Sequence, residues 1–381
     1  MPEALIAVNH IGFMHFILQD IDILREMGFS VDVAADNTAG ERHTEALIME
    51  HGASRLLDIR LDRGATLTRG NLRCYRAYRD LLRKKNYSLV IAHTPIIGFI
   101  VRMAARSASV RERGGKVIYF SHGMMYNHLI HSFSAYVFAL LERYASRYCN
   151  AICCLNSEDR EAFGKMHAPA VYQVPGVGLD LTRFQGLTMD RDAMRVSLGV
   201  RKDAVMVLSV GRLSPEKNQI SVVRSLGLLA DRKRFTFVIC GGSSDGGAVR
   251  ASLEQEAARL GVDLVLLGHR SDVPQVIACA DIGVLTSLRE GLGVGGLELL
   301  ASGVPVIGTD VQGIREFCKD GETGVRIPHP NDIKAIAAAI KRLSDSNLRE
   351  SMRASCCRMA ERFSLENSVA CRRRIYQEVL G

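Results

Sequence analysis

The chain has 381 residues, which is too long for one ordinary hydrophobic core, so its length predicts two domains. A content of 47% hydrophobic and 24% charged residues is typical of a soluble globular protein. No run approaches the roughly 18 consecutive apolar residues of a membrane span, and no basic segment of the kind that opens a signal peptide precedes the first apolar run. Ten cysteines without a Cys-x-x-Cys spacing disfavour a zinc site or a disulfide framework and indicate reduced thiols in a cytoplasm.

The formal net charge is +8, and the positive charge is concentrated in one segment. Between Arg69 and Lys116 stand twelve Lys or Arg residues and only two acidic ones. Steps of three and four residues place several of these cations on one face of a predicted helix. Two interpretations are open: a solvated helix surface, or a dock for anionic lipid head groups or a phosphate-bearing acceptor. Nucleic acid is disfavoured, because no DNA-binding motif accompanies the charge. The cations of the predicted helix are Arg69, Arg73, Arg76, Arg79, Arg83, Lys84 and Lys85.

Short apolar runs alternate with amphipathic stretches along nearly the whole chain. The apolar runs have the length of buried strands, and the amphipathic stretches have helical periodicity. In chain order, the predicted strands are Ala4–Val8, Ser30–Ala34, Ser88–Ala92, Lys116–Phe120, Ala151–Leu155, Val205–Val210, Phe235–Cys240, Asp263–Leu267, Ile282–Leu285 and Val304–Gly308. The predicted helices include Phe16–Met27, Leu72–Lys84, Ile220–Ala230, Ala248–Leu260, Val273–Ala278 and a last one from Ser364. This alternation predicts an α/β fold with parallel sheets.

The alternation pauses in a polar stretch between Gly176 and Asp203. We place the domain boundary there, with one domain over residues 1–183 and a second over residues 184–363. Two doubly wound Rossmann-like domains would then face each other across a cleft. Ligands of such sheets bind beyond the carboxyl ends of the strands.

Two acidic residues mark the loop after the predicted strand Ile282–Leu285. Glu290 and Glu298 are separated by seven residues, four of them glycine, and a short helical stretch is expected from Glu298 to Ser302. A bare loop lets a ligand touch backbone N–H groups, and the N-terminus of the following helix favours an anion. Because carboxylates accept hydrogen bonds from hydroxyls, a sugar or a ribose is the natural partner. The acid pair of a glycosidase is disfavoured, since the chain has no tryptophan to line a sugar-chain groove.

The predicted strand Val205–Val210 is followed by a glycine turn and two cations, Arg212 and Lys217. An arginine can fork onto a phosphate, and a lysine can supply a point charge, so the two residues suit a diphosphate. They would also stabilise negative charge on a departing diphosphate. Each could be an ordinary surface charge, but the acidic loop in the same domain favours the functional interpretation.

In these motifs the chain resembles the retaining glycosyltransferases of family 4, and the resemblance covers nearly the whole sequence. It rests on the segment Gly211–Asn218 together with Glu290 and Glu298, and on residues 175–184, 303–307, 313–316 and 321–324. Residues 93–95 and 121–123 are typical of the bacterial subgroup that builds exopolysaccharide, capsule or lipid-linked oligosaccharides. The resemblance implies the GT-B fold of two Rossmann-like domains, with a C-terminal helix over 364–381 that packs back on the first domain.

The resemblance also implies a role for each matching residue. Arg212 and Lys217 would hold the donor diphosphate, and Glu298 would bind the ribose hydroxyls of the nucleotide. Glu290, with nearby backbone amides, would contact the donor sugar. The predicted donor-binding set is Gly12, Gly211, Arg212, Lys217, Glu290, Gly291, Leu292, Gly293 and Glu298, and the predicted catalytic set is His122, Arg212, Lys217 and Glu290.

The acceptor half of the predicted site belongs to the first domain. His122 follows the strand Lys116–Phe120, and the resemblance places it near the donor sugar; a turn residue satisfied by local backbone is the alternative. His15 and His93 are predicted to contact the acceptor. The loop around Gly12 departs from the family's glycine-rich version, which leaves its approach to the donor phosphate open.

No metal and no cofactor are expected. The Asp-x-Asp of the metal-dependent GT-A type is missing between strands, since Asp190 and Asp192 have the spacing but lie in the polar linker. Cationic side chains and a helix dipole would take the place of Mg²⁺. The nucleotide sugar itself is a substrate and not a cofactor.

The sequence therefore predicts a retaining, metal-independent hexosyl- or N-acetylhexosaminyltransferase. It would move a sugar from a nucleotide diphosphate sugar, UDP-linked, to a lipid-linked or polysaccharide-precursor acceptor, in the cytoplasm or peripherally on the inner face of the cytoplasmic membrane. Two alternatives are open: a non-hydrolysing nucleotide-sugar epimerase, and a non-catalytic sugar-nucleotide-binding subunit of a polysaccharide assembly complex. The donor sugar, the linkage and the oligomeric state do not follow from fold and motif.

Overall fold

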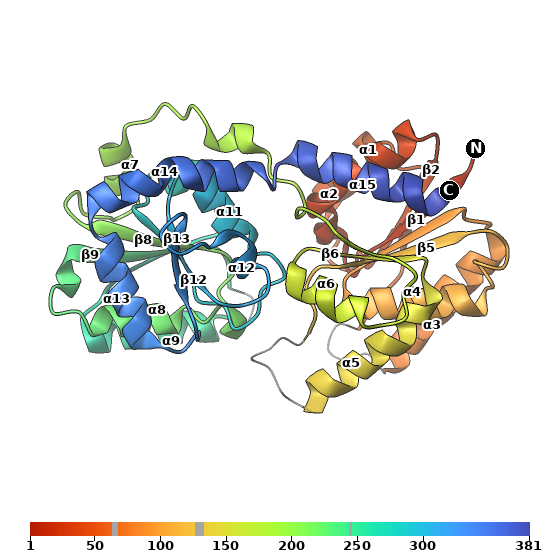
Figure 1. Ribbon diagram of the computed structural model, residues 1–381, viewed down its shortest axis with the longest axis horizontal. Helices are drawn as coiled ribbons and strands as arrows, with labels where there is room; N and C mark the ends of the chain where they lie inside the picture. The colour runs from red at the N-terminus through yellow and green to blue at the C-terminus, as the bar shows by residue number, and fades with distance from the viewer. Residues whose placement is uncertain (63–67, 126–132, 244–245) are drawn as a thin grey trace. The chain divides into compact units, whose positions relative to one another are not determined.

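The computed structural model describes residues 1–62, 68–125, 133–243 and 246–381. The chain divides into two compact units, each built on its own parallel sheet (Figure 1). The first unit consists of Met1–Gly178 and Glu366–Gly381, and the second consists of Leu179–Leu365. The division therefore falls after Gly178, five residues before the boundary suggested by the sequence. The C-terminal helix belongs to the first unit.

The first unit contains a seven-stranded sheet in the order β3-β2-β1-β4-β5-β6-β7, in which neighbouring strands are parallel. Strand β1 is flanked on both sides, since Ala4 pairs with Val31 on β2 and with Leu89 on β4. This is the doubly wound order, in which helices cover both faces. The strands are β1 (Glu3–Ala7), β2 (Ser30–Ala35), β3 (Arg55–Asp58), β4 (Leu89–His93), β5 (Lys116–Ser121), β6 (Ala151–Cys154) and β7 (Val171–Gln173).

The helices of the first unit come from both ends of the chain. Their termini follow ordinary capping rules: the Thr68 hydroxyl accepts the N–H of Asn71 at the start of α3, and Pro95 begins α4, where a missing N–H is tolerated. The helices are α1 (Leu18–Glu26), α2 (Arg42–Glu50), α3 (Arg69–Lys84), α4 (Pro95–Ser107), α5 (Phe133–Ala145), α6 (Ser157–Gly164) and α15 (Leu365–Leu380).

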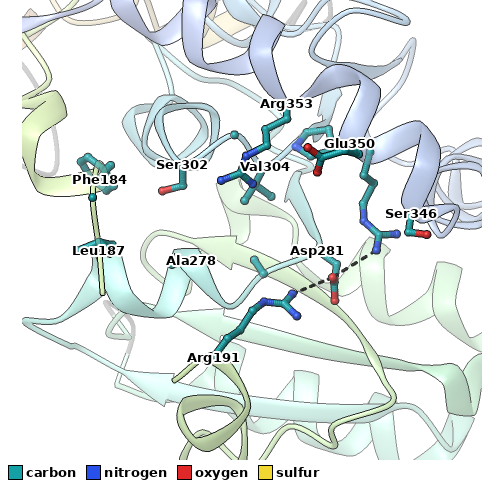
Figure 2. Close-up of a pocket in the computed structure, with 15 residues that line it drawn as sticks. Phe184, Leu187, Arg191, Ala278, Asp281, Ser302, Val304, Ser346, Glu350 and Arg353 are labelled. Atoms are coloured by element: carbon teal, nitrogen blue, oxygen red, sulfur yellow. Dashed lines mark hydrogen bonds and ion pairs between the residues drawn. The ribbon is translucent and has the colours of Figure 1, made fainter. Parts of the chain in front are cut away.

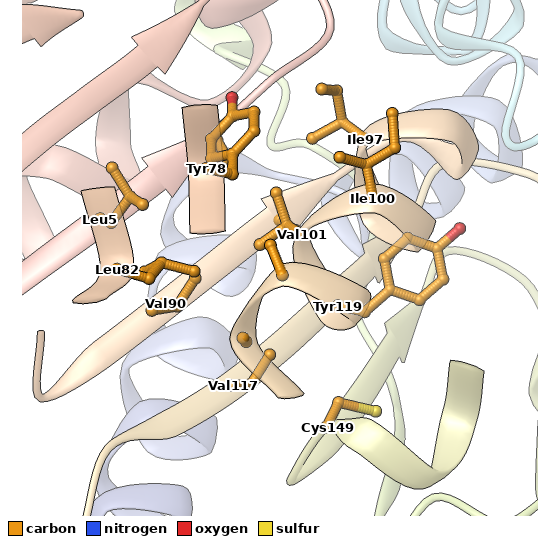
Figure 3. Packing of buried hydrophobic residues seen from close by; sticks show 14 of the residues in the cluster. Leu5, Tyr78, Leu82, Val90, Ile97, Ile100, Val101, Val117, Tyr119 and Cys149 are labelled. Atoms are coloured by element: carbon orange, nitrogen blue, oxygen red, sulfur yellow. The ribbon is translucent and has the colours of Figure 1, made fainter. Parts of the chain in front are cut away.

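The core of the first unit lies between the sheet and helices α3 and α4 (Figure 3). Leu5, Val90 and Val117 project from three adjacent strands and are fully buried against Tyr78 of α3 and Val101 of α4. Burying one valine or leucine side chain contributes about 1.5–3 kcal/mol. This packing fixes the carboxyl ends of β4 and β5, where two predicted site histidines stand: one ends β4 and the other follows β5.

The second unit contains a six-stranded parallel sheet in the order β10-β9-β8-β11-β12-β13. Its strands are β8 (Val205–Val210), β9 (Phe235–Cys240), β10 (Asp263–Gly268), β11 (Ile282–Leu285), β12 (Val306–Thr309) and β13 (Gly324–Ile327). Its helices are α7 (Arg191–Ser197), α8 (Ile220–Gly227), α9 (Ala248–Leu260), α10 (Val273–Ala278), α11 (Val294–Ala301), α12 (Ile314–Phe317), α13 (Ile333–Leu343) and α14 (Ser346–Glu361). Because β8 and β11 are neighbours, the loops after them lie side by side.

All ten predicted strands are present, with their ends shifted by at most two residues. Strands β3, β7 and β13 were not expected. Each lies at an edge of its sheet, spans only three or four residues and is partly exposed, so it carries too little periodicity to be recognised. No helix in the described parts of the chain is both long enough and apolar enough to cross a membrane. The ten cysteines are free thiols.

Candidate active site

The carboxyl end of β8 leads into a turn that carries both predicted cations. The N–H of Gly211 donates to the carbonyl of Cys240 at 2.9 Å, which attaches the turn to β9. Arg212 is exposed, and its guanidinium makes no ion pair or hydrogen bond with any residue that the structure describes. Lys217 folds back over the turn, so that its Cε would lie 3.6 Å from a methyl group on Gly211. Both cations therefore belong to one short turn.

Lys217 and Glu290 form an ion pair through the Oε2 atom of the carboxylate. The hydroxyl of Ser287 donates to the same oxygen at 3.1 Å. The side chains of Lys217 and Glu290 are 26% and 16% exposed, so the pair is shielded but still reachable from water. A phosphate oxygen can exchange with the carboxylate as the partner of Lys217, because an ammonium group binds either anion.

Hydrogen bonds hold the turn after β8 against the loop after β11. The hydroxyl of Thr286 donates to the carbonyl of Asn218 at 3.0 Å, and the N–H of Leu288 donates to the carbonyl of Glu216 at 2.8 Å. These bonds explain how the lysine and the glutamate meet, although 73 positions separate them.

Helix α11 begins one turn earlier than predicted, at Val294 and not at Glu298. Gly293 precedes it with a φ of +88°, which other residues rarely adopt. Gly295 lies against the carbonyl oxygen of Val210, where any side chain would clash. The expectation of an open glycine loop up to Glu298 is therefore wrong. Gly295 and Gly296 belong to the first helical turn, and this turn comes close to the end of β8 because Gly295 has no side chain. The low helix propensity of glycine explains why the start of the helix was predicted too late.

Glu298 lies one turn inside α11 and is half buried. Burial raises the pKa of its carboxyl to about 7, and the charge of Arg183 opposes part of that rise. The carboxylate makes no hydrogen bond or ion pair within the described residues. The pKa of the Cys240 thiol is raised by burial, to which the charges of Asp272 and Glu298 add, so Glu298 lies near the end of β9. When ionised, Glu298 is therefore available to accept hydrogen bonds from hydroxyls.

These elements together can hold a diphosphate that carries hydroxyl-bearing groups. Two cations and the positive end of the α11 dipole supply the positive side. Two carboxylates supply the acceptors. The fold brings the following predicted residues to the carboxyl ends of β8 and β11 and the start of α11: Gly211, Arg212, Lys217, Glu290, Gly291, Leu292, Gly293 and Glu298.

A separate hollow of about 490 Å³ opens at the other end of the strands of the same sheet (Figure 2). Asp281 stands directly before β11 and Val304 shortly before β12, so this hollow lies at the amino ends of the strands. Arg191 and Arg349 both pair with Asp281, at 2.9 and 3.4 Å, and so attach α7 and α14 to the sheet. The hollow is therefore distinct from the predicted donor region.

In the first unit, His93 and His122 form a pair at the ends of β4 and β5. Nδ1 of His93 and Nε2 of His122 are 2.9 Å apart and share a hydrogen bond. Burial, together with the His93 ring and the charge of Arg372, lowers the pKa of His122 well below its usual value, and burial does the same to His93. His93 is completely buried, whereas His122 is half buried. The acceptor contact predicted for His93 would therefore have to act through His122.

Gly12 and His15 lie in a 3-10 turn at Ile11–Phe16. His15 is exposed, and its Nε2 shares a hydrogen bond of 3.0 Å with the hydroxyl of Thr44. The carboxylate of Glu41 covers Gly12, where a methyl group would lie 2.7 Å from its Oε2. A negative charge at this point opposes a phosphate, so the arrangement counts against the donor contact predicted for Gly12, which stays a prediction.

No sequence motif marks the residues behind the histidine pair. Asp20 on α1 and Arg372 on α15 are 2.7 Å apart in space but 352 positions apart in sequence. A lone acid in one helix and one arginine in another carry no motif, and only their shared burial marks them. Arg183, near Glu298, lies in the segment 175–184 that carries the family resemblance, but no role was predicted for it.

The described residues contain no group of three or more His, Cys, Asp or Glu side chains that could hold a metal ion. Asp190 instead begins α7, where its carboxylate accepts the N–H groups of Asp192 and Ala193 at 3.0 Å each. The metal-independent reaction predicted above stays a prediction.

Two family models match the chain: Glycosyl transferases group 1 over residues 190–359 and Glycosyltransferase Family 4 over residues 21–181. EpsD of Bacillus subtilis (strain 168), a protein named as a glycosyltransferase, is 30% identical over 278 residues, which cover 72% of this chain and 71% of EpsD. The UDP-Gal:alpha-D-GlcNAc-diphosphoundecaprenol alpha-1,3-galactosyltransferase of Escherichia coli is 27% identical over 281 residues, with coverage of 72% and 71%. The chain is thus an enzyme of the glycosyltransferase class and belongs to glycosyltransferase family 4.

The fold agrees with this assignment. The crystal structure of HepE from Anabaena in complex with UDP-glucose superimposes with a TM-score of 0.79 at 18% identity, covering 99% of this chain and 100% of HepE. The predicted GT-B fold of two Rossmann-like domains is confirmed, and so is the family resemblance.

Proposed function

We propose that this glycosyltransferase moves a hexosyl or N-acetylhexosaminyl group from a UDP-sugar to a lipid-linked saccharide or another polysaccharide precursor. The convergence of Arg212, Lys217, Glu290 and Glu298 at the ends of β8 and β11 carries the proposal. The printed substrates of two similar proteins support it. The Escherichia coli relative is named for a UDP-Gal donor and a diphosphoundecaprenol-linked acceptor, and HepE is seen with UDP-glucose.

In the proposed complex, the donor lies along the second unit. The guanidinium of Arg212 makes no ion pair or hydrogen bond within the described residues, although its charge acts on Glu216, and it forks onto the diphosphate. Lys217 gives up or shares its ion pair with Glu290 to bind a phosphate oxygen. The N-terminus of α11 adds its dipole to the same charge. Glu298 accepts hydrogen bonds from the ribose hydroxyls, and Glu290 turns toward the donor sugar.

The transferred sugar keeps its anomeric configuration in this proposal. Glu298 accepts hydrogen bonds from the ribose and Glu290 from the donor sugar, so neither carboxylate acts as a nucleophile in this proposal. The acceptor hydroxyl instead attacks from the face that the diphosphate leaves. Its oxygen bonds to the anomeric carbon as the bond from that carbon to the diphosphate breaks, and its proton passes to the departing diphosphate. Arg212 and Lys217 stabilise the charge that develops there, which takes the place of a metal ion.

The first unit provides the acceptor side in this account. His122 is neutral and half buried, and it offers a ring nitrogen to a sugar hydroxyl. His15 is exposed and adds a polar contact for the acceptor saccharide.

A lipid-linked acceptor calls for a surface that meets a membrane, and the first unit has one with the fitting chemistry. The exposed cations of α3 are Arg69, Arg73, Arg76, Arg83 and Lys84. The other two predicted cations are already paired: Arg79 with Asp80, and Lys85 with Glu3 and Asp32. On α5, Phe133, Tyr136 and Leu140 are 84%, 63% and 49% exposed, which is unusual for large apolar side chains on one helix.

Helix α4 contacts both α3 and α5, so the basic and the apolar helices belong to one face. The Arg102–Glu142 ion pair, 2.8 Å long and buried, fixes α5 on α4. Between α3 and α4 lies a mostly apolar hollow of about 600 Å³, lined by Leu72, Phe99 and Met103, with Arg69 and Arg106 at its rim. Cations beside apolar side chains match anionic head groups above acyl chains, so we propose that this face rests on an anionic membrane surface. The sequence of the apolar segment Met124–Tyr136 leaves two interpretations open, a place in the core or a contact with a polyprenyl chain or the bilayer, and positions 126–132 of it lie outside the described residues.

The proposed function is tested with radiolabelled UDP-sugars and a membrane lipid extract as acceptor source. Label that moves into the lipid fraction, with retained configuration by NMR and in the presence of a chelator, is the expected result. Conversion of the UDP-sugar into an isomer without lipid would instead identify the epimerase alternative. Tight UDP binding without turnover over the whole acceptor panel would identify a non-catalytic subunit.

A further inference from the structure

A line of polar side chains runs from His122 into the interior of the first unit. His122 shares its hydrogen bond with His93, and the Nε2 atom of His93 lies 3.6 Å from Oδ2 of Asp20. Arg372 donates from Nη1 to the same oxygen at 2.7 Å, and the hydroxyl of Tyr376 donates to Oδ1 of Asp20 at 2.8 Å. The four residues behind His122 are completely buried, so this arrangement is part of the core and not a surface contact.

Ring contacts fix the orientation of both histidines. The ring of Phe120 stacks on His93 at 4.9 Å and 17°, and the ring of Phe13 meets His122 edge-on at 4.7 Å and 81°. Tilting either imidazole would break these contacts, and a half-turn of His93 would take its Nδ1 away from Nε2 of His122. Only the position of the proton on each ring is left to be determined.

A neutral imidazole carries one N–H, so the bond between the two rings has two possible directions. If His93 donated from Nδ1, the lone pair on its Nε2 would face the carboxylate of Asp20, and the two would repel. If His93 keeps its proton on Nε2, that N–H points toward Asp20, and Nδ1 accepts the Nε2–H of His122. The carboxylate favours the second direction, which leaves Nδ1 of His122 as a lone pair.

Arg372 offsets the cost of burying the Asp20 carboxylate, because an unpaired charge at this depth would strongly destabilise the fold. Its charge also opposes protonation of both histidine rings, while Asp20 acts in the opposite sense on His122. Helix α15 is anchored nearby, since the hydroxyl of Ser368 donates to the carbonyl of Gly176 at 3.0 Å. The C-terminal helix thus supplies the counter-ion for a group that stands behind His122.

We propose that Asp20 and His93 are positioning residues that hold His122 in its Nε2–H tautomer, so that its Nδ1 accepts a hydrogen bond from a hydroxyl of the sugar substrate. This assignment rests on the proposed function for the identity of the ligand, but the tautomer itself is a property of the protein alone. In the opposite tautomer, Nδ1–H would donate to the hydroxyl oxygen, and the hydroxyl proton would lose its acceptor on His122. Loss of the Asp20 charge would therefore change the tautomer of His93, then that of His122, and so the hydrogen bond to the substrate.

The test is a long-range ¹H–¹⁵N correlation spectrum of the full-length protein labelled at histidine, with His122 assigned by comparison with His122→Gln. The expected spectrum shows the proton of His122 on Nε2 at pH 8. In Asp20→Asn, the negative charge that favours the proton on Nε2 of His93 is lost, so the Nδ1–H form of His122 should become more populated and kcat/KM should fall about 10- to 100-fold.

Tyr376→Phe is the matched control, because it removes a hydrogen bond from the same carboxylate but keeps its charge. It should retain the Nε2–H tautomer and stay within about threefold of the parent activity. A parent protein with His122 in the Nδ1–H form overturns the proposal, whether or not any variant folds. An Asp20→Asn protein with unchanged tautomer and activity overturns it as well. The tautomer can be read without a substrate, so failure of the proposed function would show separately, as absent transfer with a spectrum as expected.

Discussion

Two ion pairs illustrate how differently the two units use charge. Lys217 and Glu290 in the second unit are 26% and 16% exposed and lie on loops after strands. Asp20 and Arg372 in the first unit are 0% exposed and lie on two helices. The first pair can exchange a partner for a ligand, whereas the second cannot open without exposing a buried charge. We infer that the first pair belongs to binding and turnover, and the second to the fixed frame behind His122.

The largest expected effect comes from breaking the buried pair. Arg372→Met should lower the free energy of unfolding by about 3–5 kcal/mol, because it leaves the Asp20 carboxylate buried without a counter-ion. Urea denaturation of the purified variant measures this. The double variant Asp20→Leu/Arg372→Met should recover most of the loss, and Lys217→Met should cost less than about 1 kcal/mol. Equal losses for Arg372→Met and Lys217→Met would abolish the distinction between the pairs.

For the Lys217–Glu290 pair we expect the reverse: a large effect on turnover and a small effect on stability. Lys217→Ala should cut kcat/KM about 100- to 1,000-fold, because it removes a charge placed to stabilise the departing diphosphate. Its thermal unfolding should be close to that of the parent. Arg224→Ala is the matched control, since Arg224 also pairs with a glutamate of the second unit, Glu256 at 2.9 Å, but stands on α8. A drop in activity as large in the control as in Lys217→Ala would speak against a role in the reaction.

Glu298 should make nucleotide binding depend on pH. Its pKa of about 7 means that the ionised form, which accepts hydrogen bonds from the ribose, increases between pH 6 and 8. Calorimetric affinity for UDP should therefore rise over this range. Glu298→Gln should bind UDP about 10- to 100-fold more weakly at pH 8 and should lose this pH dependence. A flat pH profile in the parent protein would remove Glu298 from the ribose site.

The same residue should lower the stability of the folded protein. A carboxyl whose pKa is raised by folding destabilises the native state progressively as pH rises from about 4.5 to about 7, and by a constant amount above that. Glu298→Gln should therefore raise the free energy of unfolding by about 1–3 kcal/mol at pH 8 and have little effect at pH 4.5. Urea titrations at the two pH values measure the difference, and a gain that is equal at both would contradict the pKa shift.

The smallest expected effect concerns the face formed by α3 and α5. Tyr136→Ser/Leu140→Ser should weaken cosedimentation with anionic phosphatidylglycerol vesicles about tenfold, and Arg73→Gln/Arg76→Gln should do so most clearly at low salt. Affinity for UDP should be unchanged in both variants, because the proposed nucleotide site lies in the second unit. Parent protein that stays in the supernatant with such vesicles at low salt would refute the membrane-facing role.

The meeting of the loops after β8 and β11 could be predicted, because the parts of each loop are close in sequence. Gly211, Arg212 and Lys217 follow one strand within seven positions, and the two glutamates follow another, so the order of parallel strands brings both groups together. The start of α11 was predicted wrongly, because propensity counts glycine against a helix, whereas Gly295 is needed for the contact with β8.

The frame behind His122 could not be predicted, since its partners come from opposite ends of the chain. Asp20 gave no signal within α1, and Arg372 resembled any other arginine of a polar helix. Even where the sequence indicated a residue, it could not indicate burial: His93 is enclosed, although its motif suggested contact with an acceptor. Local patterns therefore described the strands and the donor loops, while the long-range polar contacts needed the folded chain.

The most direct test of the central claim is a crystal structure of the protein soaked with UDP. The account predicts diphosphate oxygens within hydrogen-bond distance of Arg212 and Lys217, with the ribose hydroxyls on the carboxylate of Glu298. UDP bound elsewhere, or none bound at saturating concentration while Lys217 still holds Glu290, would contradict it.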